Sequence, residues 1–217
     1  MDEAGLLACA MYVDLNPIRA AMAESPDQAV HTSAYDRIKG ERGEEIPSAA
    51  FDLVTVSPEE AGKQLRETTV AEQKKQRAAK RRNPTGKRIL RDSWLAPLTL
   101  SPKSLADDPQ VHSGGVRASD KGFLNLPWRD YLALLRWTSK QRLKEAVGEV
   151  PEKLQIVLAS LGIEASMWRD LVWDFKRYFG AASCAGSPDS MAADAARTGK
   201  RFHRCQRQVA ECFASVG

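Results

Sequence analysis

The sequence predicts a mainly α-helical protein with long irregular loops. Apolar residues recur at intervals of three and four near both ends of the 217-residue chain, which is the period of an amphipathic helix. Serine–proline–acid triplets at 57–59 and 187–189 are typical helix starts. The stretch 92–126 is rich in Pro, Gly, Ser and Asp, which indicates loop. We expect three parts, 1–40, 41–126 and 127–217.

The N-terminal part opens with a predicted helix over 3–15, because no helix breaker precedes Pro17. A short helix is expected to restart at Pro17, since proline suits a first helical turn, and to run to about Ala23. Turns and loop follow, with a brief helical piece near 35–38.

The middle part contains a predicted helix over 57–82, which the sequence Asn83-Pro84-Thr85-Gly86 ends. Its second half and the residues beyond it are strongly basic: Lys74, Lys75, Arg77, Lys80, Arg81, Arg82, Lys87, Arg88 and Arg91. Few acids balance this run, which favours contact with nucleic-acid phosphates. The alternative is an ordinary solvated charged helix.

The C-terminal part predicts helices that start near 128, 151, 164 and 188, the third continuing to Gly180. No strand pattern is visible over 127–217. Four tryptophans fall at helical spacing here: Trp128, Trp137, Trp168 and Trp173. We interpret them as core residues, and a stacking platform for single strands is the alternative.

Composition excludes some classes of protein. The chain is 43% hydrophobic with net charge +4, so a folded core is expected. No apolar run is long enough to cross a bilayer and no basic secretion signal opens the chain, so we expect a cytoplasmic protein without a membrane partner. Four cysteines form no disulfide framework. His203 lies near Cys205 and Cys212, which leaves open either a metal site or ordinary buried or solvated thiols.

A tyrosine and an asparagine stand four residues apart in "YVDLNPIRA". On one helix, Tyr12 and Asn16 would share a face, with Cβ atoms roughly 5–6 Å apart. A phenol and a carboxamide oxygen placed in this way can approach one metal ion or one phosphate, which suits a tyrosine nucleophile that attacks a phosphodiester. The alternative is a helix cap beside a core tyrosine.

The segment "YVDLNPIRAAMAESPDQAVHTSAYDRI" resembles the nucleophile-bearing segment of the IS200-like, REP-associated single-tyrosine transposases. The resemblance implies that Tyr12 forms a 5′-phosphotyrosine link to DNA, that Asn16 binds Mg²⁺ or Mn²⁺, and that Arg19 lies near phosphate. It implies single-stranded or hairpin DNA as the partner and leaves both monomer and homodimer open. Ala21 departs from the glycine frequent at that position.

The family's two other metal ligands, a histidine–hydrophobic–histidine pair on a central strand, are not found in this sequence. His31, His112 and His203 are all solitary. We therefore expect a transposase fragment that lacks the α/β catalytic sheet, binds DNA and does not cleave it alone. We also expect the apolar face of the 3–15 helix to be exposed where that sheet would pack. A non-enzymatic nucleic-acid-binding or protein-interaction module is the alternative.

Overall fold

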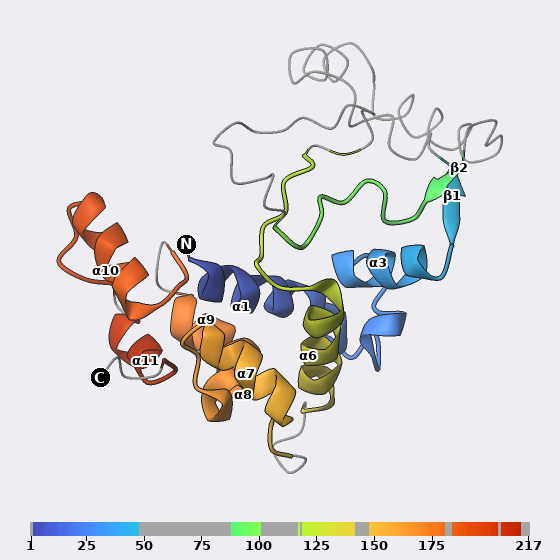
Figure 1. The fold of residues 1–217 in the computed structure, drawn as a ribbon. Coiled ribbons are helices and arrows are strands. Elements are labelled where there is room, and N and C mark those ends of the chain that lie inside the picture. Colours follow the sequence, from blue (N-terminus) through green and yellow to red (C-terminus); the bar gives the residue numbers. More distant parts are fainter. Residues whose placement is uncertain are drawn as a thin grey trace, which may run out of the picture. The chain divides into compact units, whose positions relative to one another are not determined.

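The computed structural model describes residues 2–47, 88–100, 117, 119–141, 148–180, 184–203 and 205–213. Within these residues the chain is mainly helical, which confirms the predicted class (Figure 1). The chain divides into two compact units. The first, called the helical unit, comprises 1–35, 98–100 and 123–217, and the second, called the strand unit, comprises 36–97 and 101–122.

The helical unit contains most of the described helices. They are α1 (Glu3–Asp14), α2 (Asn16–Arg19), a 3₁₀ turn (Pro26–Gln28), the start of α3 (Ser33–Glu41), α6 (Trp128–Lys140), α7 (Glu152–Ser160), α8 (Ala165–Trp173), α9 (Phe175–Phe179), α10 (Pro188–Arg197) and α11 (Gln206–Ala210). No described helix combines the length and the apolar character needed to cross a bilayer.

The Asp2 carboxylate links the starts of two helices. One oxygen accepts the Gly5 N–H at 2.9 Å and caps α1. The other accepts the Ser187 N–H at 2.8 Å and the Ser187 hydroxyl. Ser187 is itself the N-cap of α10 and accepts the Ser190 N–H. The predicted helix start at Ser187-Pro188 is confirmed, and it is fastened to the start of α1.

The apolar residues of α1 and α2 form the centre of the core. Leu7, Ala8, Met11, Leu15 and Ile18 are 0–1% exposed. Helix α1 packs against α8 and α9 of the same chain (Figure 1). The expectation that this face would be exposed is therefore wrong, because C-terminal helices cover it.

Asp14, the last residue of α1, is 2% exposed and connects three elements. Its carboxylate accepts the Tyr131 hydroxyl of α6 at 2.7 Å. It also accepts the Ser33 hydroxyl at 3.0 Å and the Ala34 N–H at 3.3 Å, at the start of α3. A buried carboxyl group needs such partners, and here they join the end of α1 to α3 and α6.

Helix boundaries differ from the prediction at two places. The expected single helix over 164–180 is interrupted at Asp174, whose φ of −102° and ψ of 30° leave the helical range, so that α8 and α9 are separate. The helix that begins at Asn16 ends at Arg19 instead of about Ala23, and Ala21 has a φ of +57°.

Among the tryptophans, Trp168 is fully buried and donates to the Thr138 hydroxyl at 2.9 Å. The core interpretation is confirmed for Trp168.

The strand unit holds an antiparallel pair, β1 (Glu45–Pro47) and β2 (Arg88–Leu90), in which Ile46 lies opposite Ile89. Arg91 follows β2 and pairs with Asp36 and with Glu44, at 2.7 Å each. Burial lowers the pKa of Arg91, whereas the Asp36 and Glu44 carboxylates raise it, and the pKa is raised overall. This pair is the only sheet among the residues that the structure describes, and the predicted helix over 57–82 lies outside them.

Candidate functional site

Tyr12 and Arg19 meet at the junction of α1 and α2. Leu15, between the two helices, keeps right-handed dihedral angles (φ −86°, ψ −6°), so the chain continues along a helical path past the break. Residues seven apart then lie on one side, two turns from each other. The Arg19 guanidinium carbon lies 4.5 Å from the centroid of the Tyr12 ring, which is a cation–π contact.

Helices α8 and α9 supply the rest of this environment. The Phe175 ring stacks on Tyr12, with centroids 4.6 Å apart and an interplanar angle of 26°. Arg19 donates to the Val172 carbonyl at 3.1 Å and lies 5.9 Å from the Trp173 ring. The interruption at Asp174 lies between Trp173 and Phe175, so both sides of the break contact the Tyr12–Arg19 pair.

The polar groups of this site remain available to a ligand. Tyr12 and Arg19 are partly buried and Asn16 is exposed. Among the described residues, neither the Tyr12 hydroxyl nor the Asn16 carboxamide has a hydrogen-bond partner, and no carboxylate pairs with Arg19. A guanidinium has five N–H donors. With one donated to Val172, Arg19 keeps donors and an uncompensated charge for an anion.

Helix α9 adds two cations that were not singled out from the sequence. Lys176 and Arg177 directly follow Phe175 and are exposed. No ion pair holds either of them within the described residues. Nothing in the sequence places α9 beside residues 12–19, since the two segments are more than 150 positions apart. The Arg177 guanidinium lies 5.7 Å from the centroid of the Tyr178 ring. We name Tyr12, Asn16 and Arg19 the tyrosine face.

The described residues do not fit the Mg²⁺ or Mn²⁺ site that the resemblance implies. Asn16 would supply one amide oxygen, but no group of three potential His, Cys, Asp or Glu ligands lies around it in the described ranges. Asp14, two residues before Asn16, is buried and already accepts three hydrogen bonds. The described residues therefore assign no metal ion to the tyrosine face.

Most of the predicted basic run cannot be placed. Lys74, Lys75, Arg77, Lys80, Arg81, Arg82 and Lys87 lie outside the described residues. Arg88 is exposed, donates to the Glu45 carbonyl at 2.7 Å and lies 3.4 Å from its carboxylate. Arg91 shares its charge with Asp36 and Glu44. Of these two described arginines, Arg91 has two carboxylate partners and Arg88 has one.

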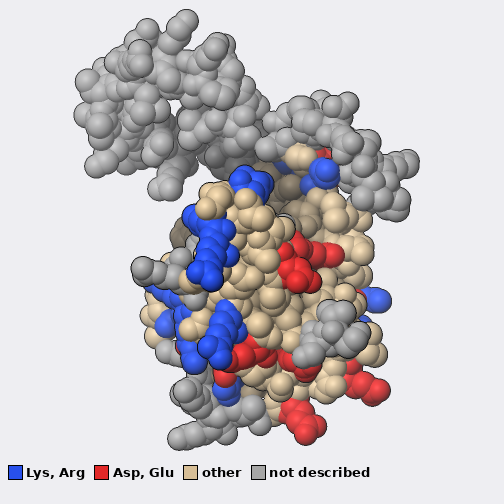
Figure 2. Space-filling model, turned by 90° about the vertical axis from the view of Figure 1, so that its left-hand side faces the viewer, with Lys and Arg blue, Asp and Glu red and all other residues tan. Residues whose placement is uncertain are grey.

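Exposed lysines and arginines also occur near the C-terminal end of the helical unit. Lys200, Arg201 and Arg207 are exposed there. Figure 2 shows basic residues gathered along one side of the face turned to the viewer, with acidic residues beside them. The pattern is mixed in sign, so this surface alone does not distinguish a nucleic-acid partner from an ordinary solvated surface.

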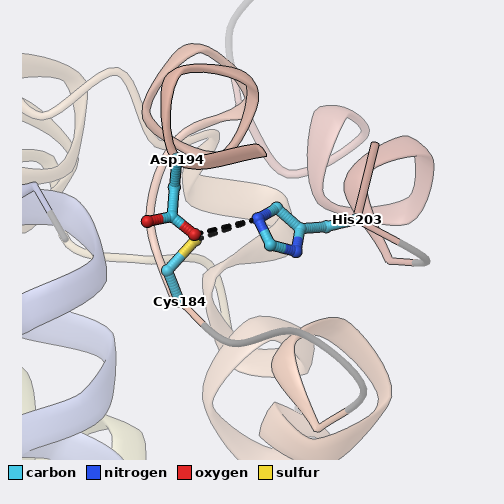
Figure 3. A group of neighbouring side chains, drawn as sticks. All are labelled: Cys184, Asp194 and His203. Atoms are coloured by element: carbon cyan, nitrogen blue, oxygen red, sulfur yellow. Dashed lines mark hydrogen bonds and ion pairs between the residues drawn. The ribbon is translucent and has the colours of Figure 1, made fainter. Parts of the chain in front are cut away.

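A second polar cluster lies at α10 and consists of Cys184, Asp194 and His203 (Figure 3). His203 Nε2 lies 3.1 Å from Asp194 Oδ2 and 3.7 Å from Cys184 Sγ. One ligand atom from each residue lies within 4.8 Å of the others. The His203 side chain is 2% exposed and that of Asp194 is 16% exposed. We name these three residues the α10 cluster.

The end of α10 brings these residues together. The Gly199 N–H bonds to the Ala196 carbonyl and the Lys200 N–H to the Ala195 carbonyl, which is the Schellman arrangement. Gly199 has a φ of +69°, the left-handed conformation that favours glycine. The chain therefore turns back, and His203 reaches Asp194 in the last turns of α10. Arg197 donates to Asp194 Oδ1 at 2.6 Å, leaving Oδ2 for His203.

The pKa values of the thiol and the carboxyl group in the α10 cluster are shifted in opposite directions. Burial, followed by the neighbouring Asp194 carboxylate, raises the pKa of the Cys184 thiol. The hydrogen bond from Arg197 is the main cause that lowers the pKa of Asp194. Because its pKa is raised, Cys184 is a protonated thiol at neutral pH and a poor nucleophile.

Sequence reasoning found only one member of the α10 cluster. His203 was considered with Cys205 and Cys212, but its partners are Cys184 and Asp194. Cys205 and Cys212 are buried, and Cys212 hydrogen bonds to Tyr178. All four cysteines are free. The sequence did contain one signal for this cluster: Gly199, just past the end of α10, indicates that the chain folds back there.

Comparison with known proteins assigns no family. No protein-family model, no curated protein and no solved structure matches the chain.

Proposed function

We propose that this chain binds the phosphate backbone of DNA. We also propose that it presents the nucleophile helix of a single-tyrosine DNA strand transferase. The observation that supports this best is Arg19, a partly buried guanidinium with no carboxylate partner in the described residues, held 4.5 Å from the Tyr12 ring. Arginine is the residue best suited to phosphate, because its planar fork matches two phosphate oxygens.

The remainder of the tyrosine face and helix α9 support the same ligand. Asn16 is exposed three residues before Arg19, and Lys176 and Arg177 are exposed on α9, whose Phe175 stacks on Tyr12. Cations grouped on one surface are typical of proteins that follow a nucleic-acid backbone. A phosphate held by Arg19 would lie beside the tyrosine that the resemblance identifies as the nucleophile.

Binding and cleavage are separate parts of this proposal. The histidine pair of the resembling enzymes does not occur in this sequence, and Asn16 has no group of further ligands around it in the described ranges. We therefore propose a cytoplasmic protein that binds DNA and does not cleave it alone. Incubation with a single-stranded hairpin and Mn²⁺ tests this; a covalent adduct that disappears in Tyr12→Phe would contradict it.

The binding experiment compares two arginine variants. The affinity for a fluorescent single-stranded oligonucleotide is measured at several salt concentrations for the wild type, Arg19→Gln and Arg129→Gln. Arg129 is the control, since its side chain is 79% exposed on α6. We expect Arg19→Gln to weaken binding and to reduce the slope of log affinity against log salt by about 1. Arg19→Lys should recover part of the affinity.

A flat salt dependence in the wild type would contradict the proposal. Equal behaviour of Arg19→Gln and Arg129→Gln would remove the tyrosine face from it. The basic run is tested separately by neutralising Lys80, Arg81 and Arg82 together. Affinity that is unchanged by this triple variant would exclude those residues as phosphate contacts.

The alternative function is a non-enzymatic module that binds nucleic acid or protein. One observation favours it: α1 packs against α8 and α9 of the same chain, and Tyr12 stacks on Phe175, so Tyr12 has a packing role that needs no chemistry. In that case the Arg19 variants should fold and bind DNA as the wild type does, and only Tyr12→Ala should change stability.

A further inference from the structure

We propose that Cys184, Asp194 and His203 bind one Zn²⁺ ion, with the fourth position taken by water or by a ligand. The α10 cluster combines a thiol, an imidazole and a carboxyl group, which are the three side-chain types that coordinate zinc. Its residues come from the segment before α10, the last turns of α10 and the turn after it (Figure 3). This site is independent of the tyrosine face.

Two of the three distances between ligand atoms lie within about 0.3 Å of the edges of a zinc tetrahedron. With Zn–S about 2.3 Å and Zn–N about 2.0–2.1 Å, tetrahedral angles place sulfur and nitrogen about 3.6 Å apart. The same reasoning places nitrogen and carboxylate oxygen about 3.4 Å apart. The observed separations are 3.7 Å for Cys184 Sγ to His203 Nε2 and 3.1 Å for His203 Nε2 to Asp194 Oδ2. A small adjustment of side chains therefore admits the ion.

The geometry argues against a catalytic triad. In a triad the imidazole uses one nitrogen for the nucleophile and the other for the carboxylate. Here Cys184 and Asp194 both approach the same nitrogen, Nε2 of His203. Three ligand atoms that converge on one point suit a shared ion and cannot relay a proton through the ring.

The ligand set selects zinc over magnesium or calcium. A thiolate is a soft ligand, whereas magnesium and calcium prefer oxygen. On binding, the Cys184 S–H bond breaks, sulfur bonds to the ion, and the proton is released to solvent. Arg197, which donates to Asp194 Oδ1, holds the carboxylate with Oδ2 toward the ion, as an outer hydrogen-bond partner does in zinc sites.

Three protein ligands leave one coordination position, as catalytic zinc sites do. His203 also lines a shallow open hollow on the surface, together with Pro188, Phe202, Gln206, Arg207 and Ala210. Phe202 is 60% exposed there. Solvent near this hollow is the simplest source of the fourth ligand.

The test uses the full chain, kept reduced and stripped of metal. Zinc stoichiometry and affinity are measured for the wild type, Cys184→Ser, His203→Gln and Cys9→Ser. Cys9 is the matched control because it is also free and partly buried. We expect one zinc per chain in the wild type and Cys9→Ser. We expect affinity lower by on the order of a hundredfold or more in the ligand variants, since even outer partners account for 10–100-fold.

A second measurement keeps the proposal testable if a ligand variant does not fold. Co²⁺ added to the wild type should give the absorption of a tetrahedral thiolate complex, which zinc displaces. Zinc should also protect Cys184, but not Cys9, from alkylation, as mapped by mass spectrometry. Absence of one bound zinc, equal binding by Cys184→Ser, or alkylation of Cys184 unaffected by zinc would each overturn the proposal.

Discussion

At the scale of single residues, the buried Asp14 carboxylate explains how the end of α1 is fixed. It is 2% exposed and accepts hydrogen bonds from Tyr131, Ser33 and the Ala34 N–H. A buried acceptor that loses one donor bears the full cost of its desolvation. The orientation of Tyr12 and Asn16, on either side of Asp14 in the chain, therefore depends on partners in α3 and α6.

Removing the Tyr131 hydroxyl should destabilise the protein while removing the Tyr12 hydroxyl should not. We expect Tyr131→Phe to cost about 1.5–3 kcal/mol, the range for a hydrogen bond to a charged group. Tyr12→Phe should stay within about 0.5 kcal/mol, because its hydroxyl has no partner among the described residues. Urea unfolding of both variants measures this, and equal losses would contradict the assignment of Asp14 as the acceptor.

The pair formed by Tyr178 and Cys212 should make stability fall in alkali. Burial raises the pKa of Tyr178 to about 12, from 10.0, and that of Cys212 to about 11, from 9.0. Above about pH 9 the unfolded chain releases these protons while the folded chain retains them, so the free energy of unfolding decreases as pH rises to about 12.

Urea unfolding between pH 8 and pH 11 under reducing conditions measures this decline. Cys212→Ala should flatten it most between about pH 9 and pH 10, where the cysteine of the unfolded chain has lost more of its proton than the tyrosine has. Cys9→Ala is the control and should keep the wild-type slope. A stability that rises over this range would contradict the burial of the pair.

At the scale of elements, a close backbone approach fixes α1 against the segment before α10. A Cβ atom built on Gly5 would lie 2.3 Å from the Ala185 carbonyl oxygen and 2.7 Å from the Gly186 nitrogen. Both neighbours are backbone atoms, which cannot move aside as the end of a side chain can. The same segment carries Cys184 and Ser187, so this contact positions the α10 cluster as well.

We expect Gly5→Ala to destabilise the protein by about 1–3 kcal/mol through overpacking, although alanine is the better helix former by about 1 kcal/mol. Gly148→Ala is the control, since a Cβ there meets nothing within 4 Å. Thermal unfolding compares the two. A Gly5→Ala protein as stable as the wild type would show that the helices do not approach so closely.

The helices with local sequence signals were the most predictable elements. The absence of a breaker before Pro17 predicted α1, and Ser187-Pro188-Asp189 predicted α10, because these signals are local. The interruption at Asp174 was missed, because the apolar period continues across it: Leu171, Val172, Tyr178 and Phe179 are all buried. Trp173 and Phe175, on either side of the break, contact Arg19 and Tyr12, and no local pattern contains these contacts.

At the scale of the whole molecule, the helical unit joins segments that are distant in sequence. Residues 1–35 share one core with residues 123–217. The sequence predicted helices at both ends but not that they cover each other. The missing catalytic sheet of the resembling family led to the expectation of an exposed face on α1, and this face is in fact buried. Cys184 and Asp194 were missed for the same reason: only the fold brings them next to His203.

Photochemical cross-linking tests most directly whether DNA lies on the tyrosine face. A single-stranded oligonucleotide that carries a photoreactive pyrimidine is bound to the full chain, irradiated and digested with trypsin. We predict cross-links at Tyr12, in the tryptic peptide of residues 1–19 of the wild type and Arg129→Gln and in the peptide of residues 1–37 of Arg19→Gln, which lacks the cleavage site. The yield at Tyr12 should be lower in Arg19→Gln than in Arg129→Gln. DNA that binds but cross-links only to other peptides, with no adduct at Tyr12, would contradict the proposed function.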